Sequence, residues 1–347
     1  MTNTSAVQQL HKSTTCRLDN YSIIYMSIYC FIIATGIIGN STVLYIFRPY
    51  TKRARKSYEV LIWYLSLFDV ISCVIAINEV YENLTCHEDW PFGWFGCKTI
   101  YSCYYISINI SICILLIITL DRYRCIVTPF RKKLTPTFIH TSVFVSIIIS
   151  FALQWYQFKA LHIKPHGVYN HERCVQNKGV YTYTVPRVAT LLFRDLIYIT
   201  VFSTTTLTVY RSFQRRKRRS LTYQKCDKNK GQNKNIFFML FIMGCTFAVL
   251  VLPYDIWDCA MLISRMLPQS HHINMTTGLQ HMDTALSMLQ MCNSVSNCFI
   301  YAKMHRHFKS QIVKHFYKEA EKNPQLLTQP SVGNRNSQNT EIESCFY

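Results

Sequence analysis

The stretch from Cys97 to Pro129 constrains the fold most, because it is a long apolar segment that begins at a cysteine and ends just after a charged triplet. At a helical rise of ~1.5 Å per residue, Cys97 and Arg122 lie about 37 Å apart, which is enough to cross a bilayer. The segment also carries polar residues that would be costly against lipid: Tyr101, Tyr104, Ser107, Asn109, Ser111 and Thr119. We therefore expect this helix to stand inside a bundle.

Further apolar stretches of bilayer length are separated by short polar loops, although the mean hydropathy of the 347 residues is only +0.08. Besides the central stretch, they cover residues 21–47, 57–81, 138–158, 188–213, 236–263 and 279–302. We expect an all-α membrane protein with a seven-transmembrane helix bundle in residues 21–303. We also expect an extracellular N-terminus (1–20), a short C-terminal interfacial helix (304–317) and a disordered cytoplasmic tail (318–347).

The net charge of +19 is concentrated in alternate loops, such as RKK at 131–133 and RRKRR at 215–219. This pattern follows the positive-inside rule and indicates membrane topology rather than nucleic-acid binding. Residues 1–20 are polar and do not resemble a cleavable signal peptide, so we expect the first helix to direct insertion. The four glycosylation sequons, at Asn3, Asn20, Asn83 and Asn274, all fall on the side opposite the positive loops, which predicts an extracellular N-terminus.

Several short motifs occur in order, each in its own expected helix. They are Gly39-Asn40, Leu65 with Asp69, Cys97 with Asp121-Arg122-Tyr123, Phe247 with Pro253, and Asn293-Ser294 with Asn297 to Tyr301, followed by Phe308. With these motifs the chain resembles the rhodopsin-like (class A) G-protein-coupled receptors. The stretches DRYRCIVTPFRKKLT and WPFGWFGCK look most like those of neuropeptide receptors of the RFamide and neuropeptide Y kind.

The chain departs from the family pattern at four places. Val251 stands where a switch tryptophan is usual, and Cys298 replaces a proline in span seven. Ile147 and Phe202 lie near an expected tryptophan and an expected proline. These departures concern the activation trigger and the ligand class rather than the fold.

The resemblance implies three sites besides the ligand pocket. G-protein coupling falls to Asp121, Arg122, Tyr123, Tyr210 and Tyr301, whereas the simpler interpretation makes Arg122 an interfacial anchor. The resemblance also implies a disulfide between Cys97 and Cys174. Cys16, Cys86 and Cys259 are left open as a second pair or as free thiols.

The third implied site is a sodium site in the middle of the bundle. Its residues are Asp69, Ser111, Asn293, Ser294 and Asn297, whose oxygen ligands suit a hard cation. The alternative is a polar packing cluster. We expect no other cofactor.

The ligand pocket is expected in the outer half of the bundle. Tyr104 occupies the place where amine receptors carry an aspartate, and Met291 the place where opsins carry the retinal lysine. Biogenic amines and retinal are therefore disfavoured as ligands. Acidic residues there predict a basic ligand group such as an arginine, received by Asp258 and Glu79 above Tyr104 and Gln290. The other acidic candidates are Asp255 and Asp283, of which Asp283 can equally be a solvated loop-end charge. Arg194 and Asp195 either pair internally or bind ligand.

The predicted function is a plasma-membrane receptor that binds an extracellular peptide with a basic residue and activates a heterotrimeric G-protein. Its other contact is membrane lipid. No cluster of catalytic spacing is present in the sequence, which argues against an enzyme. The alternatives are a divergent receptor with constitutive or lost signalling, suggested by Val251 and Cys298, and a small-solute transporter.

Overall fold

The computed structural model describes residues 20–48, 57–85, 90–127, 134–166, 171–220, 230–268, 273, 276–305 and 308–313. Residues up to His305 form one compact unit, and the chain from Arg306 onward forms another. In the second unit, residues 308–313 are helical, within the expected interfacial helix 304–317. The expected tail, 318–347, lies outside the described residues.

In the first unit every expected span is helical. The helices are α2 (Asn20–Ile46), α3 (Ser57–Ile75) with α4 (Ile77–Leu84), α5 (Gly93–Val127), α6 (Pro136–Leu153) with α7 (Trp155–Ala160), α8 (Val185–Ser220), α9 (Lys230–Leu250) with α10 (Leu252–Ser264), and α11 (Thr277–Met304). A π-helical turn, η1 (Val180–Thr184), precedes α8. Five of these segments are long and apolar enough to cross a membrane: 20–46, 57–84, 93–125, 136–160 and 241–264.

Local sequence explains where the helices begin and break. Thr135 caps α6 by accepting a hydrogen bond from the Phe138 N–H at 3.2 Å, and Pro136 occupies the first helical position. Pro253 lacks an N–H and lies in the first turn of α10, so the sixth span is divided at Val251. Gly93 adopts φ 58°, a left-handed conformation that favours glycine, and it turns the chain into α5.

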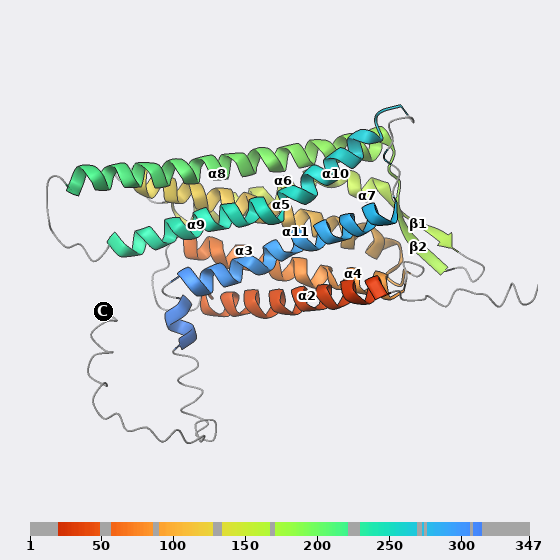
Figure 1. Ribbon diagram of the computed structural model, residues 1–347, viewed down its shortest axis with the longest axis horizontal. Coiled ribbons are helices and arrows are strands. Elements are labelled where there is room, and N and C mark those ends of the chain that lie inside the picture. Colours follow the sequence, from red (N-terminus) through yellow and green to blue (C-terminus); the bar gives the residue numbers. More distant parts are fainter. Residues whose placement is uncertain are drawn as a thin grey trace, which may run out of the picture. The chain divides into compact units, whose positions relative to one another are not determined.

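Helix α5 is the centre of the bundle, as expected. It packs against α3, α6 and α8, while α2 packs on α3 and α11, and α9 on α8 and α11 (Figure 1). Within its most apolar window 61% of α5 is buried, against 22% for α2 and for the 136–160 segment. Its neutral polar residues therefore face other helices.

A β-hairpin covers the end of the bundle that the sequons place outside. Strands β1 (Leu161–His166) and β2 (His171–Gln176) pair antiparallel, with Ile163 opposite Cys174. The hairpin contacts α5 and α7 (Figure 1). The sequence analysis treated this segment only as a loop.

Candidate functional site

A buried ion pair joins the fifth and sixth spans in the outer half of the bundle. Arg194 on α8 donates from Nε to Asp255 Oδ2 at 2.8 Å, and its Nη2 contacts Asp255 Oδ1. Gln290 on α11 donates to the same carboxylate at 3.0 Å. Because both charged side chains are almost fully buried, at 2% and 0% exposure, this contact joins three spans in a water-poor interior. Of the two alternatives left open for Arg194, the structure shows internal pairing.

A second ion pair lies toward the outside. Arg187, also on α8, donates from Nε and Nη2 to Asp258 Oδ2, both at 2.9 Å. Its guanidinium lies 4.1 Å from the centre of the Tyr105 ring, a cation–π contact. Asp258, which the sequence analysis assigned to a basic ligand group, is thus paired with a cation of α8, and its role in ligand binding stays a prediction.

Glu79 lines a cavity of about 80 Å³ in the outer half of the bundle. Tyr101, Tyr104, Tyr254 and Gln290 are among its other lining residues. This cavity brings together three of the predicted ligand residues, Glu79, Tyr104 and Gln290. Its wall is acidic and aromatic.

Next to this cavity, a hydrogen-bonded group holds a second acidic residue. Glu82 is buried and accepts hydrogen bonds from Asn78 at 2.6 Å and from the Tyr101 hydroxyl. Its carboxylate is therefore held by donors of the same wall. Sequence reasoning did not select Glu82.

The remaining predicted pocket residues are Asp283 and Asp195. Asp283 accepts a hydrogen bond from the Trp257 indole at 2.8 Å. Asp195 has a buried oxygen, Oδ1, without a hydrogen-bond partner. Partial burial and the like charge of Arg265 lower the pKa of Lys178, in the loop after β2, while Asp258 and Asp283 oppose that change. The outer pocket thus mixes acidic and basic groups rather than forming a purely negative rim.

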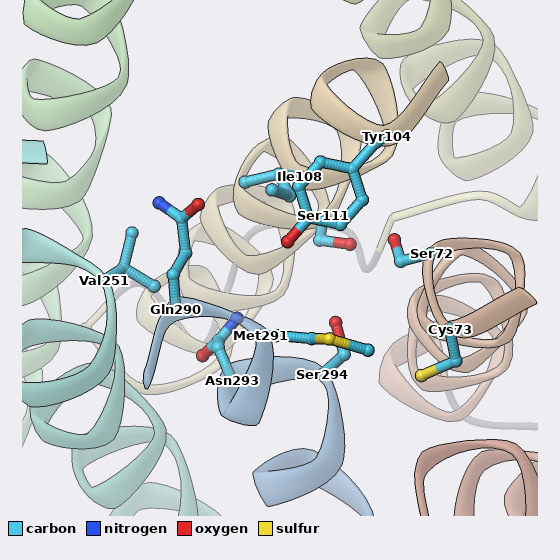
Figure 2. Close-up of a pocket in the computed structure, with 10 residues that line it drawn as sticks. All are labelled: Ser72, Cys73, Tyr104, Ile108, Ser111, Val251, Gln290, Met291, Asn293 and Ser294. Carbon is cyan, nitrogen blue, oxygen red and sulfur yellow. The ribbon is translucent and has the colours of Figure 1, made fainter. Parts of the chain in front are cut away.

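The central polar cluster lies below this pocket. Asn297 donates to Asp69 Oδ2 at 2.9 Å, while Asp69 Oδ1 and Ser111 Oγ are buried without hydrogen-bond partners. Ser111, Asn293 and Ser294 line a cavity of about 10 Å³, at the lower limit for one water-sized particle (Figure 2). A small cation can bind buried oxygens that accept no hydrogen bond, such as Asp69 Oδ1 and Ser111 Oγ. These residues therefore fit the sodium site that the resemblance implies.

Val251 lines the same cavity from the break between α9 and α10. It is fully buried. The place of the usual tryptophan is therefore filled by a small aliphatic side chain.

At the inner end of α5, Arg122 contacts the buried Asp121 through both Nε, at 3.0 Å, and Nη2. Its guanidinium also lies 4.5 Å from the centre of the Tyr58 ring. The neighbouring Tyr123 hydroxyl accepts a hydrogen bond from Arg211 on α8 at 3.4 Å. The Arg122 side chain is only 12% exposed and is held inside the bundle. A side chain that only anchored the helix at the membrane surface would instead extend toward the lipid headgroups.

The two tyrosines predicted to assist coupling differ in position. Tyr301 is fully buried, and its hydroxyl has no hydrogen-bond partner. Tyr210 is 58% exposed on α8. In the part of the chain that the structure describes, neither tyrosine makes a hydrogen bond or ring contact with Arg122.

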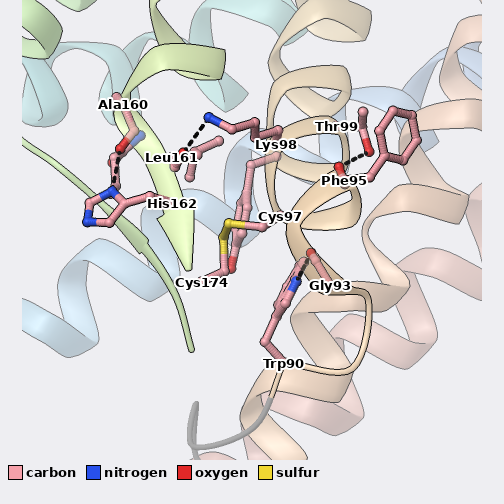
Figure 3. The surroundings of a disulfide bond; sticks show 12 residues. Trp90, Gly93, Phe95, Cys97, Lys98, Thr99, Ala160, Leu161, His162 and Cys174 are labelled. Atoms are coloured by element: carbon pink, nitrogen blue, oxygen red, sulfur yellow. Dashed lines mark hydrogen bonds between the residues drawn. A yellow bond between two sulfur atoms is a disulfide. The ribbon is translucent and has the colours of Figure 1, made fainter. Parts of the chain in front are cut away.

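Cys97 and Cys174 form a disulfide, which fastens β2 to the start of α5 (Figure 3). Around it, Trp90 packs with Cys97 and Leu161, and its indole donates to the Gly93 carbonyl at 3.0 Å. The WPFG segment thus has a structural role beside the disulfide. Cys259 is a free thiol, and Cys16 and Cys86 lie outside the described residues.

Two predicted glycosylation sites are described. Asn20 is exposed at the start of α2. Asn83 is half-buried in α4, and its side-chain amide donates to the Glu79 carbonyl at 2.6 Å. Asn3 and Asn274 lie outside the described residues.

Sequence reasoning missed Arg187, Glu82 and Tyr105. A signal was present for Arg187, because it precedes Arg194 by seven residues and so lies on the same face of α8. Asp255 and Asp258 share a face of α10 in the same way. Two basic and two acidic residues on single faces of neighbouring spans indicate paired contacts.

The family model described as "7 transmembrane receptor (rhodopsin family)" matches residues 39–301. Galanin receptor 2a of Danio rerio is 23% identical, covering 90% of this chain and 83% of that protein. Neuropeptide Y receptor type 6 of Mus musculus is 24% identical, with coverages of 82% and 78%. Endothelin receptor type B of Oryctolagus cuniculus is 35% identical over 116 residues, which are 33% of this chain and 26% of that protein.

The family match spans most of the helical bundle and its polar cluster. It confirms the expected seven-span fold. It also shows that the chain is a receptor and neither an enzyme nor the small-solute transporter named as an alternative. The chain belongs to the rhodopsin family of seven-transmembrane receptors.

Proposed function

We propose that this receptor binds an extracellular peptide through a basic residue, whose cation enters the cavity beside Glu79. The observation that carries the proposal is the acidic and aromatic wall of the cavity of about 80 Å³ in the outer half of the bundle. Glu79, Tyr104 and Tyr254 all line this cavity. A guanidinium there gains a charge-assisted contact with Glu79 and aromatic contacts with Tyr104 and Tyr254.

The relatives support a peptide ligand. Two similar proteins are named as receptors for galanin and for neuropeptide Y. The resemblance extends over most of this chain, including the helices that line the cavity. A peptide approaches from the outside, the same end of the bundle at which the disulfide joins β2 to the start of α5.

The test begins with a screen of amidated peptides that contain arginine, read out as G-protein activation in cells. Once an agonist is found, Glu79→Gln and replacement of the ligand arginine by neutral citrulline are combined in a double-mutant cycle. Each single change should weaken potency about thirtyfold, which is ~2 kcal/mol for stranding one partner of a desolvated charge pair. The combined change should cost little more than either alone.

Asp258→Asn serves as the matched control. Because Asp258 is paired with Arg187, its neutralisation should lower potency equally for the arginine and citrulline peptides. Additive losses for Glu79→Gln and citrulline would contradict the Glu79 contact. A citrulline effect that disappears only in Asp258→Asn would instead assign the cation to Asp258.

The polar cluster in the middle of the bundle is proposed as a sodium site that stabilises the resting receptor. Asp69 supplies the charge, and Ser111, Asn293, Ser294 and Asn297 supply neutral oxygen ligands. Asp69→Asn removes the charge without changing the size of the side chain. Agonist affinity should then lose its dependence on sodium chloride relative to choline chloride.

A divergent receptor with altered basal signalling stays the second candidate. Its supporting observation is Val251, which fills the position of a switch tryptophan with a small buried side chain. G-protein activation measured without any peptide separates this candidate from a ligand-dependent receptor. Basal activity that is unchanged by every peptide in the screen would favour it.

A further inference from the structure

A cleft of about 610 Å³ lies between the outer ends of the fourth and fifth spans. It is lined from α6, α7, η1, α8 and the loop before η1, and it shares no residue with the two cavities around Tyr104. Two aromatic residues of its lining, Trp155 and Tyr181, are 60% and 86% exposed. The cleft is therefore separate from the ligand pocket and open to the surroundings of the bundle.

The backbone of both spans creates this cleft. The fourth span is interrupted at Gln154, between α6 and α7, and the π-helical turn η1 widens the entry into α8. At the cleft, Thr190 donates to the Leu153 carbonyl at 3.2 Å, which links α8 to the end of α6. Ala189 is exposed there and leaves the space unfilled. The cleft is thus bordered by the backbone irregularities of both spans and by a hydrogen bond between them.

The charge of the cleft is positive. Lys159 is exposed in its wall, and the described structure shows no ion-pair partner for it. Residues 134–160 and 177–193 contain no Asp or Glu. A lysine flanked by tryptophan and tyrosine at the end of a membrane span is typical of the lipid headgroup region.

An apolar track leads from the cleft along α8. Leu192 and Leu196 follow Ala189 at helical spacing and are 58% and 62% exposed. In a membrane protein this face meets acyl chains. A cationic wall joined to an apolar track complements a molecule with a phosphate headgroup and a hydrocarbon chain.

We propose that this cleft binds one phospholipid of the outer membrane leaflet, with its phosphate at Lys159 and an acyl chain along Ala189, Leu192 and Leu196. Asn177 and Thr182, which also line the cleft, supply neutral donors to the headgroup. The volume lies within the range of ligand sites, ~300–1,000 Å³, and accommodates the headgroup and the start of one chain. The inference is independent of which peptide the receptor binds.

The experiment uses the full-length receptor, purified in mild detergent and titrated with phosphatidylglycerol, phosphatidylcholine or diacylglycerol. Native mass spectrometry measures the first bound lipid. Both phospholipids should bind better than diacylglycerol, and Lys159→Gln should abolish that preference with a loss of about fivefold, as expected for one lysine near a lipid phosphate. Ala189→Phe, which fills the cleft, should weaken all three lipids.

Lys164→Gln is the matched control, because Lys164 is exposed on β1 and does not line the cleft. It should leave the phosphate preference intact. Equal losses in Lys164→Gln and Lys159→Gln would indicate general surface charge and overturn the proposal. Unchanged binding in both Lys159→Gln and Ala189→Phe would overturn it as well.

A photoreactive phosphatidylcholine gives a readout that does not depend on mutations. After irradiation in nanodiscs, crosslinks should concentrate in the segments 152–160 and 181–192. Crosslinks spread evenly over all lipid-facing helices would mean that only bulk lipid touches this face.

Discussion

At the scale of single residues, the buried contact between Arg194 and Asp255 links the fifth and sixth spans in the outer half of the bundle. Asp255→Asn leaves the Arg194 guanidinium buried without its counter-charge, so the free energy of unfolding should fall by ~3–5 kcal/mol. Thermal unfolding of the purified receptor, followed by intrinsic fluorescence, measures the loss. The double variant Arg194→Met/Asp255→Leu removes both charges and should recover most of the stability.

Asp258→Asn is the control for this prediction. The Asp258 side chain is 19% exposed, so water compensates part of the lost contact with Arg187, and the destabilisation should be smaller. A larger loss for Asp258→Asn than for Asp255→Asn would contradict the role of burial. So would a double variant no more stable than Asp255→Asn.

The same residues show what the sequence could and could not predict. Arg194, Asp255 and Asp258 were all selected as pocket residues because charges inside spans are unusual. The spacing of Arg187 and Arg194 indicates two basic residues on one face of α8. Which carboxylate each of them meets depends on how two helices about sixty residues apart in the sequence face each other, and that is not written in the spacing.

At the scale of elements, the disulfide between Cys97 and Cys174 joins the hairpin to α5 across 77 residues of chain. Changing either cysteine to serine should destabilise the receptor by ~2–5 kcal/mol and reduce its delivery to the cell surface. The double variant should be no worse than the singles, as measured by surface staining. Cys103→Ser, at a free cysteine of α5, is the control, and additive losses at Cys97 and Cys174 would contradict the pairing.

The inner end of α5 carries the prediction on coupling. Arg122→Ala should abolish G-protein activation while surface expression is largely retained, because the guanidinium is held by Asp121 and Tyr58 and is not needed to anchor the helix. Arg211→Ala, which loses only a 3.4 Å contact to Tyr123, should reduce activation less. Full activation by Arg122→Ala would leave Arg122 as an interfacial anchor only.

The ends of the helices were predictable to within seven residues, because a bilayer requires apolar segments of fixed length. The irregular elements were not. The hairpin has few alternating apolar residues, and the break at Gln154 carries no proline or glycine. Gly179 caps the π-turn η1, but a glycine there predicts a turn in general and not a π-helical one. These irregular elements also form the lipid cleft, so that site was not visible in the sequence.

At the scale of the whole molecule, membership of the rhodopsin family makes this chain a multi-pass membrane receptor, and such receptors typically reside in the plasma membrane. The family match fixes the number of spans. The orientation of the spans in the membrane is predicted separately, from the positive loops and the glycosylation sequons. Both predict that Asn20 and Asn83 face outside and that RRKRR at 215–219 faces the cytoplasm.

The last prediction concerns this orientation. An epitope placed before Met1 should stain intact cells, whereas one placed after Tyr347 should stain only permeabilised cells. Asn20→Gln should remove one glycosidase-sensitive mass step. Asn83→Gln should remove a smaller fraction, since the Asn83 amide is donated to the Glu79 carbonyl and is poorly accessible. Staining of the C-terminal epitope on intact cells would reverse the topology, and the assignment of Glu79 to the extracellular pocket and of Arg122 to the G-protein would then fail together.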